Sequence, residues 1–346
     1  MKTRLPYLSL PVALVAVLAA CGGGGGGGAV PNTAVAKVGS VPITKASFNS
    51  LMIVGCANYR SKGQPCPKVG TDAYTQLRNQ GINFLVQQEE LQQEAQKLGV
   101  TVTQKDIDKQ IATIKKTYYK GSDKQFNEAL KKDDLTLAQV EKYNIRPNLL
   151  SQKLQAKVTS SVKVSNAAAL KYYNENKTAF ITPKTREVRH ILVNSKSLAE
   201  RLYQQLKSGA DFAKLAKKYS KDTGSAANGG KLCVAHGGQS GTCSQTVAPF
   251  DKVAFALKTN EISQPVKSQF GWHIIQALSA VKPSHKQKFS EVKSQIQQNL
   301  SQQQKNAAWQ NWLAKVTKDF QGKVSYQTGY GPATTATAST PATTTG

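Results

Sequence analysis

Apolar residues recur at helical spacing through most of the first 160 residues. In the segment 71–98 an apolar residue returns at every seventh position, at Leu77, Phe84, Leu91 and Leu98. This period predicts one long amphipathic helix, with Gly99 as its stop signal. Upstream, the stretch 34–43 predicts a short strand, a turn and a bend, and a helix should begin near Thr44.

Two threonines indicate where further helices begin. Thr103 with Asp106, and Thr136 with Gln139, have the three-residue spacing of a capping box. Apolar positions at helical spacing follow each of them. Pro147 falls inside the second helix and should kink or interrupt it, because proline lacks the backbone N–H that a helix interior needs.

The pattern changes after residue 180. Residues 188–193 alternate as in a strand, with Val188, His190 and Leu192 on one face. Helical spacing follows at 198–206 and again at 212–219, where Asp211 is the expected N-cap. A Gly-rich segment, a helix near 250–257 and a strand at 272–278 complete this region, and the mixture indicates an α+β module.

Helical periodicity returns beyond Pro283 in a segment rich in Gln and Lys. A single amphipathic helix needs a surface for its apolar stripe, so we expect this segment to fold back on the helices before residue 160. Residues 326–346 are dominated by Thr, Ala, Pro and Gly and should be disordered, because they cannot form a core.

Charge and the first twenty residues narrow the class of protein. The 46 Lys and Arg against 20 Asp and Glu give a formal net charge of +26, which favours an anionic partner such as nucleic acid, acidic lipid or a wall polymer. The apolar run 5–20 is too short to span a bilayer. It follows a positively charged start and ends in small residues, so residues 1–20 are typical of a signal peptide. We therefore expect an extracytoplasmic protein, and no nucleic acid partner.

Cys21 follows the expected cleavage site directly. The sequence 18–21, LAAC, resembles the bacterial lipobox, in which the cysteine carries lipid; an ordinary secretory signal with a chance cysteine is the alternative. The seven glycines at 22–28 suit a flexible tether. We expect a lipoprotein anchored to the membrane through Cys21, whose positive charge could also hold it against an anionic wall or lipid surface.

The other four cysteines fall into two pairs with ten-residue separations. They are Cys56 with Cys66, and Cys233 with Cys243. An exported protein meets an oxidising compartment, which favours disulfides. A metal site is the rival, but the spacing is not that of zinc ligands and no pair of histidines accompanies either couple. We predict two disulfides, the first within a loop at 56–71.

Four blocks between residues 184 and 281 resemble a parvulin-type peptidyl-prolyl isomerase. They lie at 189–193, 210–222, 229–232 and 271–275, in that family's order and spacing. The flanking helical segments, the strand VAKVG at 35–39 and the lipobox are similar to those of PrsA foldases and SurA-type chaperones. The resemblance implies an α+β fold in which a parvulin-like domain, with an antiparallel four-stranded sheet, is inserted in a mostly helical chaperone domain.

The resemblance also implies a function and a domain organisation. The function is cis/trans isomerisation of X–Pro bonds in unfolded or newly secreted polypeptides, with client binding by the helical domain. The expected parts are a signal peptide (1–20), a lipidated tether (21–33), an N-terminal chaperone domain (34–178), the parvulin-like domain (180–283), a C-terminal helix that packs on the N-terminal domain (284–325) and a tail (326–346).

The same motifs imply the residues of an isomerase site. The implied polar centre has three side chains: His190, Asp222 and His273. Six side chains would bind substrate around it: Leu232, Thr246, Phe250, Phe255, Ser268 and Phe270. From the residues alone, His190 could equally be a buried structural histidine, and Asp222 could belong to an ordinary turn.

Two departures from the family keep a second interpretation open. Thr246 stands where the family usually has methionine, and the segment 233–245 is longer than its usual Gly-rich run. The module could therefore be an inactive parvulin within a non-catalytic holdase chaperone. His236, inside the longer segment, has no family counterpart and is interpreted as a loop residue. The four histidines are scattered along the chain, so we expect no metal or other cofactor.

Overall fold

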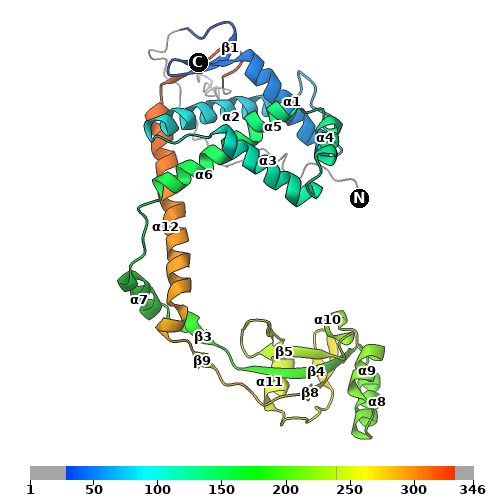
Figure 1. The fold of residues 1–346 in the computed structure, drawn as a ribbon. Helices are drawn as coiled ribbons and strands as arrows, with labels where there is room; N and C mark the ends of the chain where they lie inside the picture. The colour runs from blue at the N-terminus through cyan, green and yellow to red at the C-terminus, as the bar shows by residue number, and fades with distance from the viewer. Residues whose placement is uncertain (1–28, 239, 332–346) are drawn as a thin grey trace, which may run out of the picture. The chain divides into compact units, whose positions relative to one another are not determined.

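The computed structural model describes residues 29–331 apart from residue 239. The chain divides into two compact units, which are each described by themselves (Figure 1). Unit 1 is Met1–Val162 with Gln302–Gly346, and unit 2 is Lys163–Ser301. The predicted signal peptide, Cys21, the glycine run and residues 332–346 of the predicted tail lie outside the described residues.

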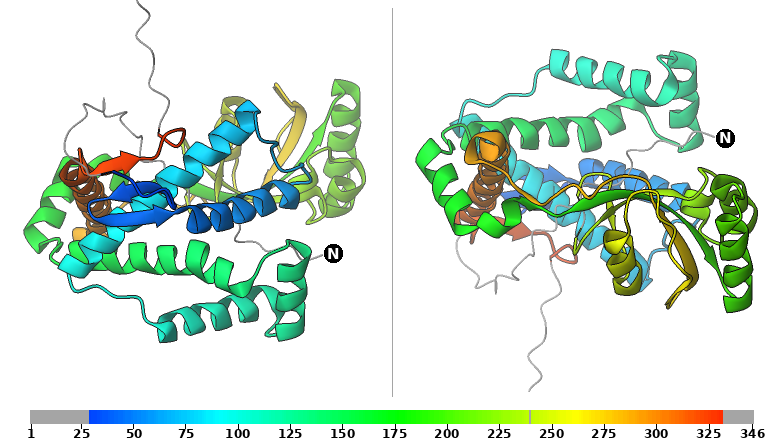
Figure 2. Two further views of the ribbon diagram at one scale, coloured as in Figure 1. Left: turned by 90° about the horizontal axis from the view of Figure 1, so that it is seen from above. Right: turned by 90° about the horizontal axis from the view of Figure 1, so that it is seen from below.

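Unit 1 combines a small sheet with a set of helices. Strands β1 (Ala34–Val38) and β2 (Val41–Thr44) form an antiparallel pair, and β10 (Val324–Tyr326) adds to the other edge of β1. Figure 2 shows β10, from the far end of the sequence, beside β1. The helices are α1 (Lys45–Ser61), α2 (Asp72–Lys97), α3 (Gln104–Tyr119), α4 (Asp123–Lys132), α5 (Leu137–Val140) and α6 (Arg146–Val158).

Four helices of unit 1, namely α1, α2, α3 and α5, begin at threonines close to the starts that the sequence predicted. Thr44 and Thr71 accept hydrogen bonds from backbone N–H groups in the first turns of α1 and α2. Both predicted capping boxes are formed, at the starts of α3 and α5. The prediction for Pro147 is also confirmed, because a π-helical turn, Glu141–Ile145, separates α5 from α6 and widens the backbone directly before the proline.

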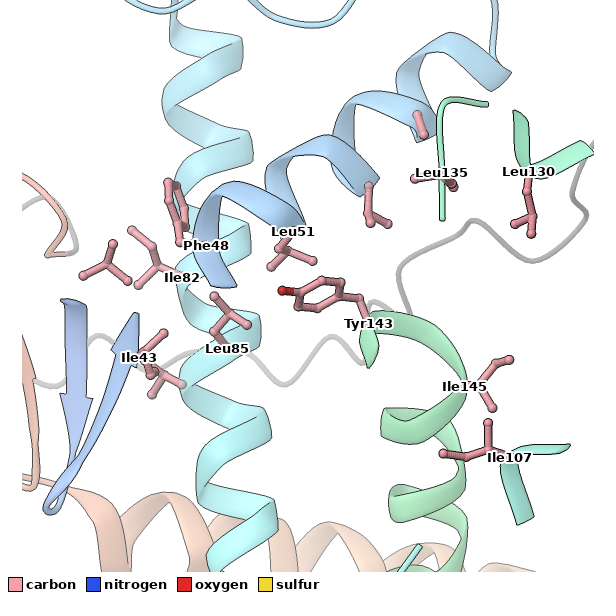
Figure 3. Close-up of a cluster of buried hydrophobic side chains, with 14 of the residues drawn as sticks. Ile43, Phe48, Leu51, Ile82, Leu85, Ile107, Leu130, Leu135, Tyr143 and Ile145 are labelled. Atoms are coloured by element: carbon pink, nitrogen blue, oxygen red, sulfur yellow. The ribbon is translucent and has the colours of Figure 1, made fainter. Parts of the chain in front are cut away.

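The core of unit 1 forms between α1, α2 and the π-helical turn. Leu51 of α1 and Ile82 of α2 are buried there, and Tyr143 reaches in from the turn (Figure 3). The Tyr143 hydroxyl donates a 2.9 Å hydrogen bond to the carbonyl of Ser47. This bond satisfies the polar end of a buried ring, so the aromatic side chain stabilises the core without an unpaired hydroxyl.

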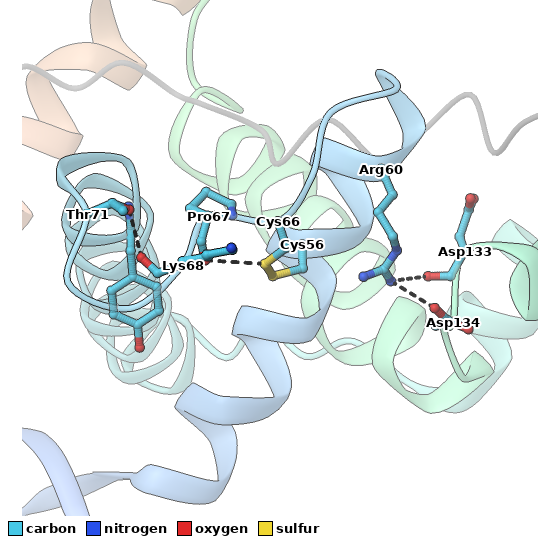
Figure 4. The surroundings of a disulfide bond; sticks show 9 residues. Cys56, Arg60, Cys66, Pro67, Lys68, Thr71, Asp133 and Asp134 are labelled. Carbon is cyan, nitrogen blue, oxygen red and sulfur yellow. Dashed lines mark hydrogen bonds and ion pairs between the residues drawn. A yellow bond between two sulfur atoms is a disulfide. The ribbon is translucent and has the colours of Figure 1, made fainter.

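Two sequence predictions for unit 1 were wrong in part. Cys56 lies inside α1 rather than in a loop, because the buried stripe of that helix continues past it to Ala57. Its disulfide to Cys66, with the Cα atoms 4.9 Å apart, therefore ties a helix to the loop before α2 (Figure 4). The tail is ordered further than expected, because Tyr326 ends β10 and Tyr330 packs edge-on against Phe48.

Helix α12 (Phe289–Phe320) contributes to both units. Its second half follows the expectation, since Val316 and Phe320 are buried in the core of unit 1. Its first half does not, because Val292 and Ile296 pack within unit 2 against α7 (Asn166–Glu175). That helix, which the sequence analysis did not predict, supplies the nearer apolar surface.

Unit 2 is built around a five-stranded sheet with the order β6-β5-β4-β8-β7. Its strands are β4 (Thr185–Val193), β5 (Lys231–Ala235), β6 (Ser244–Gln245), β7 (Val266–Ser268) and β8 (Gly271–Ala277). Four of them are antiparallel as expected, and β6 is an additional two-residue strand parallel to β5. The predicted Cys233–Cys243 disulfide holds the two ends of this insertion together, with the Cα atoms 4.4 Å apart.

Helices cover both faces of this sheet (Figure 1). Ile191 and Ile274 pack against α8 (Lys196–Lys207) and α9 (Phe212–Tyr219). Val188 and Ile275 pack against α11 (Ala248–Ala256) on the opposite face. The remaining short elements are the 3-10 turn Lys177–Phe180, α10 (Thr223–Ala226), and the paired strands β3 (Ile181–Thr182) and β9 (His285–Lys286). The α+β fold class is confirmed.

Candidate active site

Two neighbouring strands bring two histidines together on the α11 face of the sheet. In the antiparallel register of β4 and β8, His190 lies opposite Ile275 and Leu192 lies opposite His273. The two histidines are therefore diagonal neighbours, two residues apart along the strands, and their side chains point to the same face of the sheet. Their Nδ1 atoms are 3.4 Å apart, and their rings are close to parallel, with an interplanar angle of 14°.

A loop after α9 places a carboxylate against the first histidine. Asp222 caps α10, and its Oδ1 accepts the Gly224 N–H at 3.2 Å. Its Oδ2 lies 2.8 Å from His190 Nε2 and also accepts the hydroxyl of Ser225. The N–H of Lys221 donates to the carbonyl of Leu192 at 2.7 Å, so the loop is fixed to β4 through its backbone as well.

Gly230 completes the connection between this loop and β4. Its N–H donates to the Ser225 carbonyl, and its own carbonyl accepts the His190 N–H, both at 2.9 Å. The residue has φ +77°, and a Cβ at this position would lie 2.2 Å from the His190 carbonyl oxygen. Only glycine permits this close approach of the two backbones.

On the other side, the β7–β8 hairpin orients His273. Ser268 Oγ lies 2.7 Å from His273 Nε2 and accepts the N–H of Phe270 at 3.1 Å. Gly271 stands at the turn with φ +135°, and a Cβ at this position would lie 2.5 Å from the Val193 carbonyl oxygen of β4. Ser268 is buried, and its hydroxyl orients the imidazole of His273.

Burial decides the charge of both imidazoles. Desolvation lowers the pKa of His190, although the hydrogen bond to Asp222 opposes this shift. Desolvation, together with the neighbouring His190, lowers the pKa of His273 to about 4. For Asp222, partial burial raises the pKa, but the hydrogen bonds from Ser225 and His190 outweigh it and the net pKa is lowered. At neutral pH the site therefore holds two neutral imidazoles and one carboxylate.

These charges fix one order of hydrogen bonds. The carboxylate of Asp222 can only accept, so His190 donates from Nε2 and carries a lone pair on Nδ1. His273 then donates from Nδ1 to His190, and its Nε2 accepts the hydroxyl hydrogen of Ser268. The series of hydrogen bonds runs from the Phe270 N–H to the Asp222 carboxylate. Each bond in it joins one donor to one acceptor.

An apolar wall lies over the imidazoles. Phe250 of α11 is 2% exposed and meets both rings edge to face, with each centroid 5.3 Å away. Leu232 and Phe255 pack in the same apolar cluster. The Thr246 hydroxyl is buried and has no hydrogen-bond partner in the part of the chain that the structure describes. The ring of Phe270 is 59% exposed and stays at the rim.

The structure thus brings most of the predicted site into one place. His190, Asp222, His273, Ser268 and Phe250 are in direct contact, so the interpretation of Asp222 as an ordinary turn residue is incomplete: it is both a helix cap and a partner of the imidazole.

Sequence reasoning missed Ser225. Its three-residue spacing after a capping aspartate was an available signal. Over residues 29–238 and 240–331, no three or more His, Cys, Asp or Glu side chains form a group that could hold a metal ion.

Comparison with known proteins identifies what the chain is similar to. A family model for the PPIC-type PPIase domain matches residues 180–279, and one for the SurA-like N-terminal domain matches residues 3–155. A foldase protein PrsA from Caldanaerobacter subterraneus subsp. tengcongensis is 36% identical over 290 residues, which cover 80% of this chain and 82% of the relative. A PrsA from Clostridium botulinum strain Langeland is 35% identical over 245 residues, 69% of this chain and 71% of its own.

A solved structure adds one further similarity. It comes from work on PEB4 and Cj1289, described as two SurA-like chaperones of Campylobacter jejuni. The match covers 84% of this chain and 98% of the other, with 24% sequence identity and a TM-score of 0.37. Among the helices that the structure describes, none has the length and apolar character needed to cross a membrane.

Proposed function

This chain belongs to the PrsA family of foldases, and from that premise we propose that it is a lipid-anchored foldase that acts outside the cytoplasmic membrane on unfolded or newly secreted polypeptides. Its PPIC-type domain makes it a peptidyl-prolyl cis/trans isomerase.

The reaction is rotation about the C–N bond that precedes proline. Amide resonance sets a barrier of about 18–20 kcal/mol, and uncatalysed exchange takes tens to hundreds of seconds. No covalent bond breaks, so the catalyst must stabilise the twisted amide relative to the planar one. An apolar wall and a polar edge are sufficient for this task.

We assign the apolar part of the task to α11 and β5. The prolyl ring would pack against Phe250 and Leu232, whose apolar surface excludes water from the amide. A planar amide is stabilised in water because its oxygen carries negative charge. Removing that water weakens the resonance and lowers the barrier to rotation.

We assign the polar part to the hydrogen-bonded chain. The planar amide concentrates negative charge on its oxygen and loses some of it on twisting. A carboxylate facing that oxygen therefore destabilises the planar form more than the twisted form. Asp222 is the one carboxylate in the chain of hydrogen bonds, and its side chain is 31% exposed, so it can face a substrate. His190, His273 and Ser268 would hold it and the wall in place.

The observation that carries this proposal is the continuous network from Ser268 through both histidines to Asp222 beneath Phe250. The test is two-dimensional NMR exchange on a proline-containing peptide, with the full chain as catalyst. We expect accelerated exchange that His190→Ala and Asp222→Ala each reduce by at least tenfold. His285→Ala is the control, because His285 pairs with Glu291 outside this network. Equal rates for all variants would refute the assignment.

Client binding belongs to the helical unit in this proposal. Four large apolar side chains in the described part of this unit stand in solvent. They are Val41, Ile53, Val69 and Leu137, with exposed fractions of 38%, 45%, 80% and 37%. Such exposed side chains favour transient contact with unfolded chains. Suppression of aggregation of a proline-free client should persist in Asp222→Ala. Its loss together with isomerisation would contradict the division of labour between the units.

The alternative of a non-catalytic holdase loses its main support. The enlarged segment 233–245 is stapled by its disulfide and does not break the contacts between Phe250 and the two imidazoles. Thr246 still gives the wall a shorter side chain than methionine. We therefore expect catalysis with weakened proline affinity, which Thr246→Met should increase.

The anchor is proposed from Cys21, which lies outside the described residues. Mass spectrometry of the mature protein should show acyl groups on this cysteine, and Cys21→Ser should release the protein from the membrane. Cleavage would remove Lys2 and Arg4 and lower the net charge from +26 to +24. The delipidated protein should then bind anionic vesicles but not neutral ones, and release them in high salt.

A further inference from the structure

A second imidazole–carboxylate pair lies outside the network described above. His236 follows β5 directly, and its Nδ1 is 2.6 Å from Oδ2 of Asp251 in α11. The His236 ring also lies edge-on against Phe255, with the centroids 5.2 Å apart. The backbone N–H of His236 donates to the carbonyl of Lys184 at 2.9 Å. The imidazole therefore projects from a fixed point of the sheet onto the helix that carries Phe250.

The carboxylate of this pair has few hydrogen-bond partners. The side chain of Asp251 is 14% exposed, and its Oδ1 is buried without a hydrogen-bond partner over residues 29–238 and 240–331. Within those residues, His236 is the one side chain that donates a hydrogen bond to the carboxylate. A buried carboxylate needs such a donor, and hydrogen bonds to charged groups are the strong ones. The position of Asp251 thus depends on His236.

The side-chain contacts at the two ends of α11 show why this pair matters. The helix has no side-chain cap at its N-terminus, where Val247 is the capping residue. At the C-terminal end, the buried guanidinium of Arg186 donates to the carbonyls of Ala254 and Leu257. The His236–Asp251 pair is the corresponding attachment of the N-terminal half, because Asp251 is the residue after Phe250.

We propose that His236 is a positioning residue for the proline-binding wall. By holding Asp251, it fixes the N-terminal half of α11 and keeps Phe250 edge-on to His190 and His273. The inference rests on the proposed function, because it concerns the same wall. It assigns a role to the segment 233–245, whose length departs from the family pattern: the insertion supplies the imidazole that secures the wall.

The experiment separates peptide affinity from the rate of rotation. Peptide affinity is measured by NMR titration of a proline-containing peptide, and rotation by exchange at saturating peptide, both on the full chain. His236→Ala, Asp251→Ala and the double variant should each weaken affinity by about tenfold, which corresponds to loss of one charge-assisted hydrogen bond. The double variant should be no worse than either single variant, since both remove the same contact.

Conservative variants distinguish positioning from packing. His236→Asn, whose side-chain N–H donor lies at the position of Nδ1, should keep affinity within about twofold of the native chain. His236→Phe, which retains a ring against Phe255 but has no donor, should weaken affinity as His236→Ala does. His285→Ala, a change at the other half-exposed histidine with an acidic partner, should have no effect. In the variants that weaken affinity, the exchange rate at saturation should fall by less than the affinity does, because Asp222 and the two imidazoles of the network keep their hydrogen bonds.

Several results would overturn the inference. These are unchanged affinity in His236→Ala, full affinity in His236→Phe, additive losses in the double variant, or a fall in the saturated rate as large as the fall in affinity. If the alanine variants do not fold, the comparison of the asparagine and phenylalanine variants decides. Absence of binding and exchange in the native chain would instead refute the proposed function.

Discussion

Replacing Gly230 by alanine tests whether close backbone packing builds the proposed isomerase site. Gly230 joins the Asp222 loop to β4, and an added Cβ would lie 2.2 Å from the carbonyl oxygen of His190. Real Cβ atoms do not come within 3.0 Å of such a neighbour. The obstacle is backbone rather than the end of a flexible side chain, so the loop or the strand must move by close to 1 Å.

Two energies add at this position. A positive φ costs an L-residue about 1–2 kcal/mol, and overpacking against fixed atoms costs about 1–3 kcal/mol more. We therefore expect Gly230→Ala to lower the free energy of unfolding by about 2–5 kcal/mol. Gly209 offers a matched control, because it has φ +92° but no atom within 4 Å of an added Cβ. In Gly209→Ala the free energy of unfolding should fall only by the cost of the positive φ, about 1–2 kcal/mol.

Urea unfolding and the peptide exchange assay measure the two consequences. A displacement of about 1 Å in a catalytic arrangement can reduce the rate by about a hundredfold, so exchange should fall steeply in Gly230→Ala and remain native in Gly209→Ala. Equal loss of stability in the two variants would refute the argument from close approach. So would native exchange in Gly230→Ala under conditions where the variant is folded.

Three further predictions address the network, the pH dependence and the first disulfide. Ser225→Ala removes a hydrogen-bond donor that lowers the pKa of Asp222. NMR titration of the Asp222 carboxyl should therefore show a higher pKa, and peptide exchange should slow by about 3- to 10-fold. An unchanged pKa would contradict the hydrogen bond from Ser225 to Asp222. The His273 pKa is lowered from 6.5 to about 4 in the fold, so the unfolded imidazole takes up a proton between these values and the folded one does not. The contribution of His273 to the free energy of unfolding is then fully present above about pH 6.5, and that free energy should fall by up to about 3 kcal/mol as the pH drops towards 4. Urea unfolding across this pH range measures the loss. If the free energy of unfolding of His273→Gln falls with pH as steeply as that of the native chain, His273 is not the cause. Finally, the Cys56→Ser/Cys66→Ser double variant should lower the stability of unit 1 by about 2–3 kcal/mol, because the ten-residue separation closes a short loop, and it should leave peptide exchange unchanged.

Local chemistry made the helix starts predictable. A threonine or aspartate that bonds to an N–H two or three residues ahead acts within one turn, so Thr71, Thr103 and Asp211 could be recognised without knowledge of the fold. Helix α4 was not predicted, although Ser122 caps it, because its ten residues are mostly charged and polar.

The predicted site residues followed from motif order, and their contacts followed from the sheet. Alternation along 188–193 placed His190 on one face, but its contact with His273 depends on the register of β4 with β8. Register between distant strands is set by the whole sheet and cannot be read from either strand. The same limit explains why the partnership of His236 with Asp251 was not foreseen, since a loop residue gives no periodic signal.

The pairing of β1 with β10 bears on the order in which the chain acquires its structure. Lys37 lies opposite Ser325 in this sheet, so the two strands can pair only after the chain has been synthesised beyond residue 325. Unit 2 is continuous in sequence and can mature earlier, whereas the β10-β1-β2 sheet must close last. Until that point, one edge of strand β1 has no partner strand. An unpaired strand edge can pair with another chain and cause aggregation. Deletion of β10 would leave this edge of β1 unpaired in the folded protein.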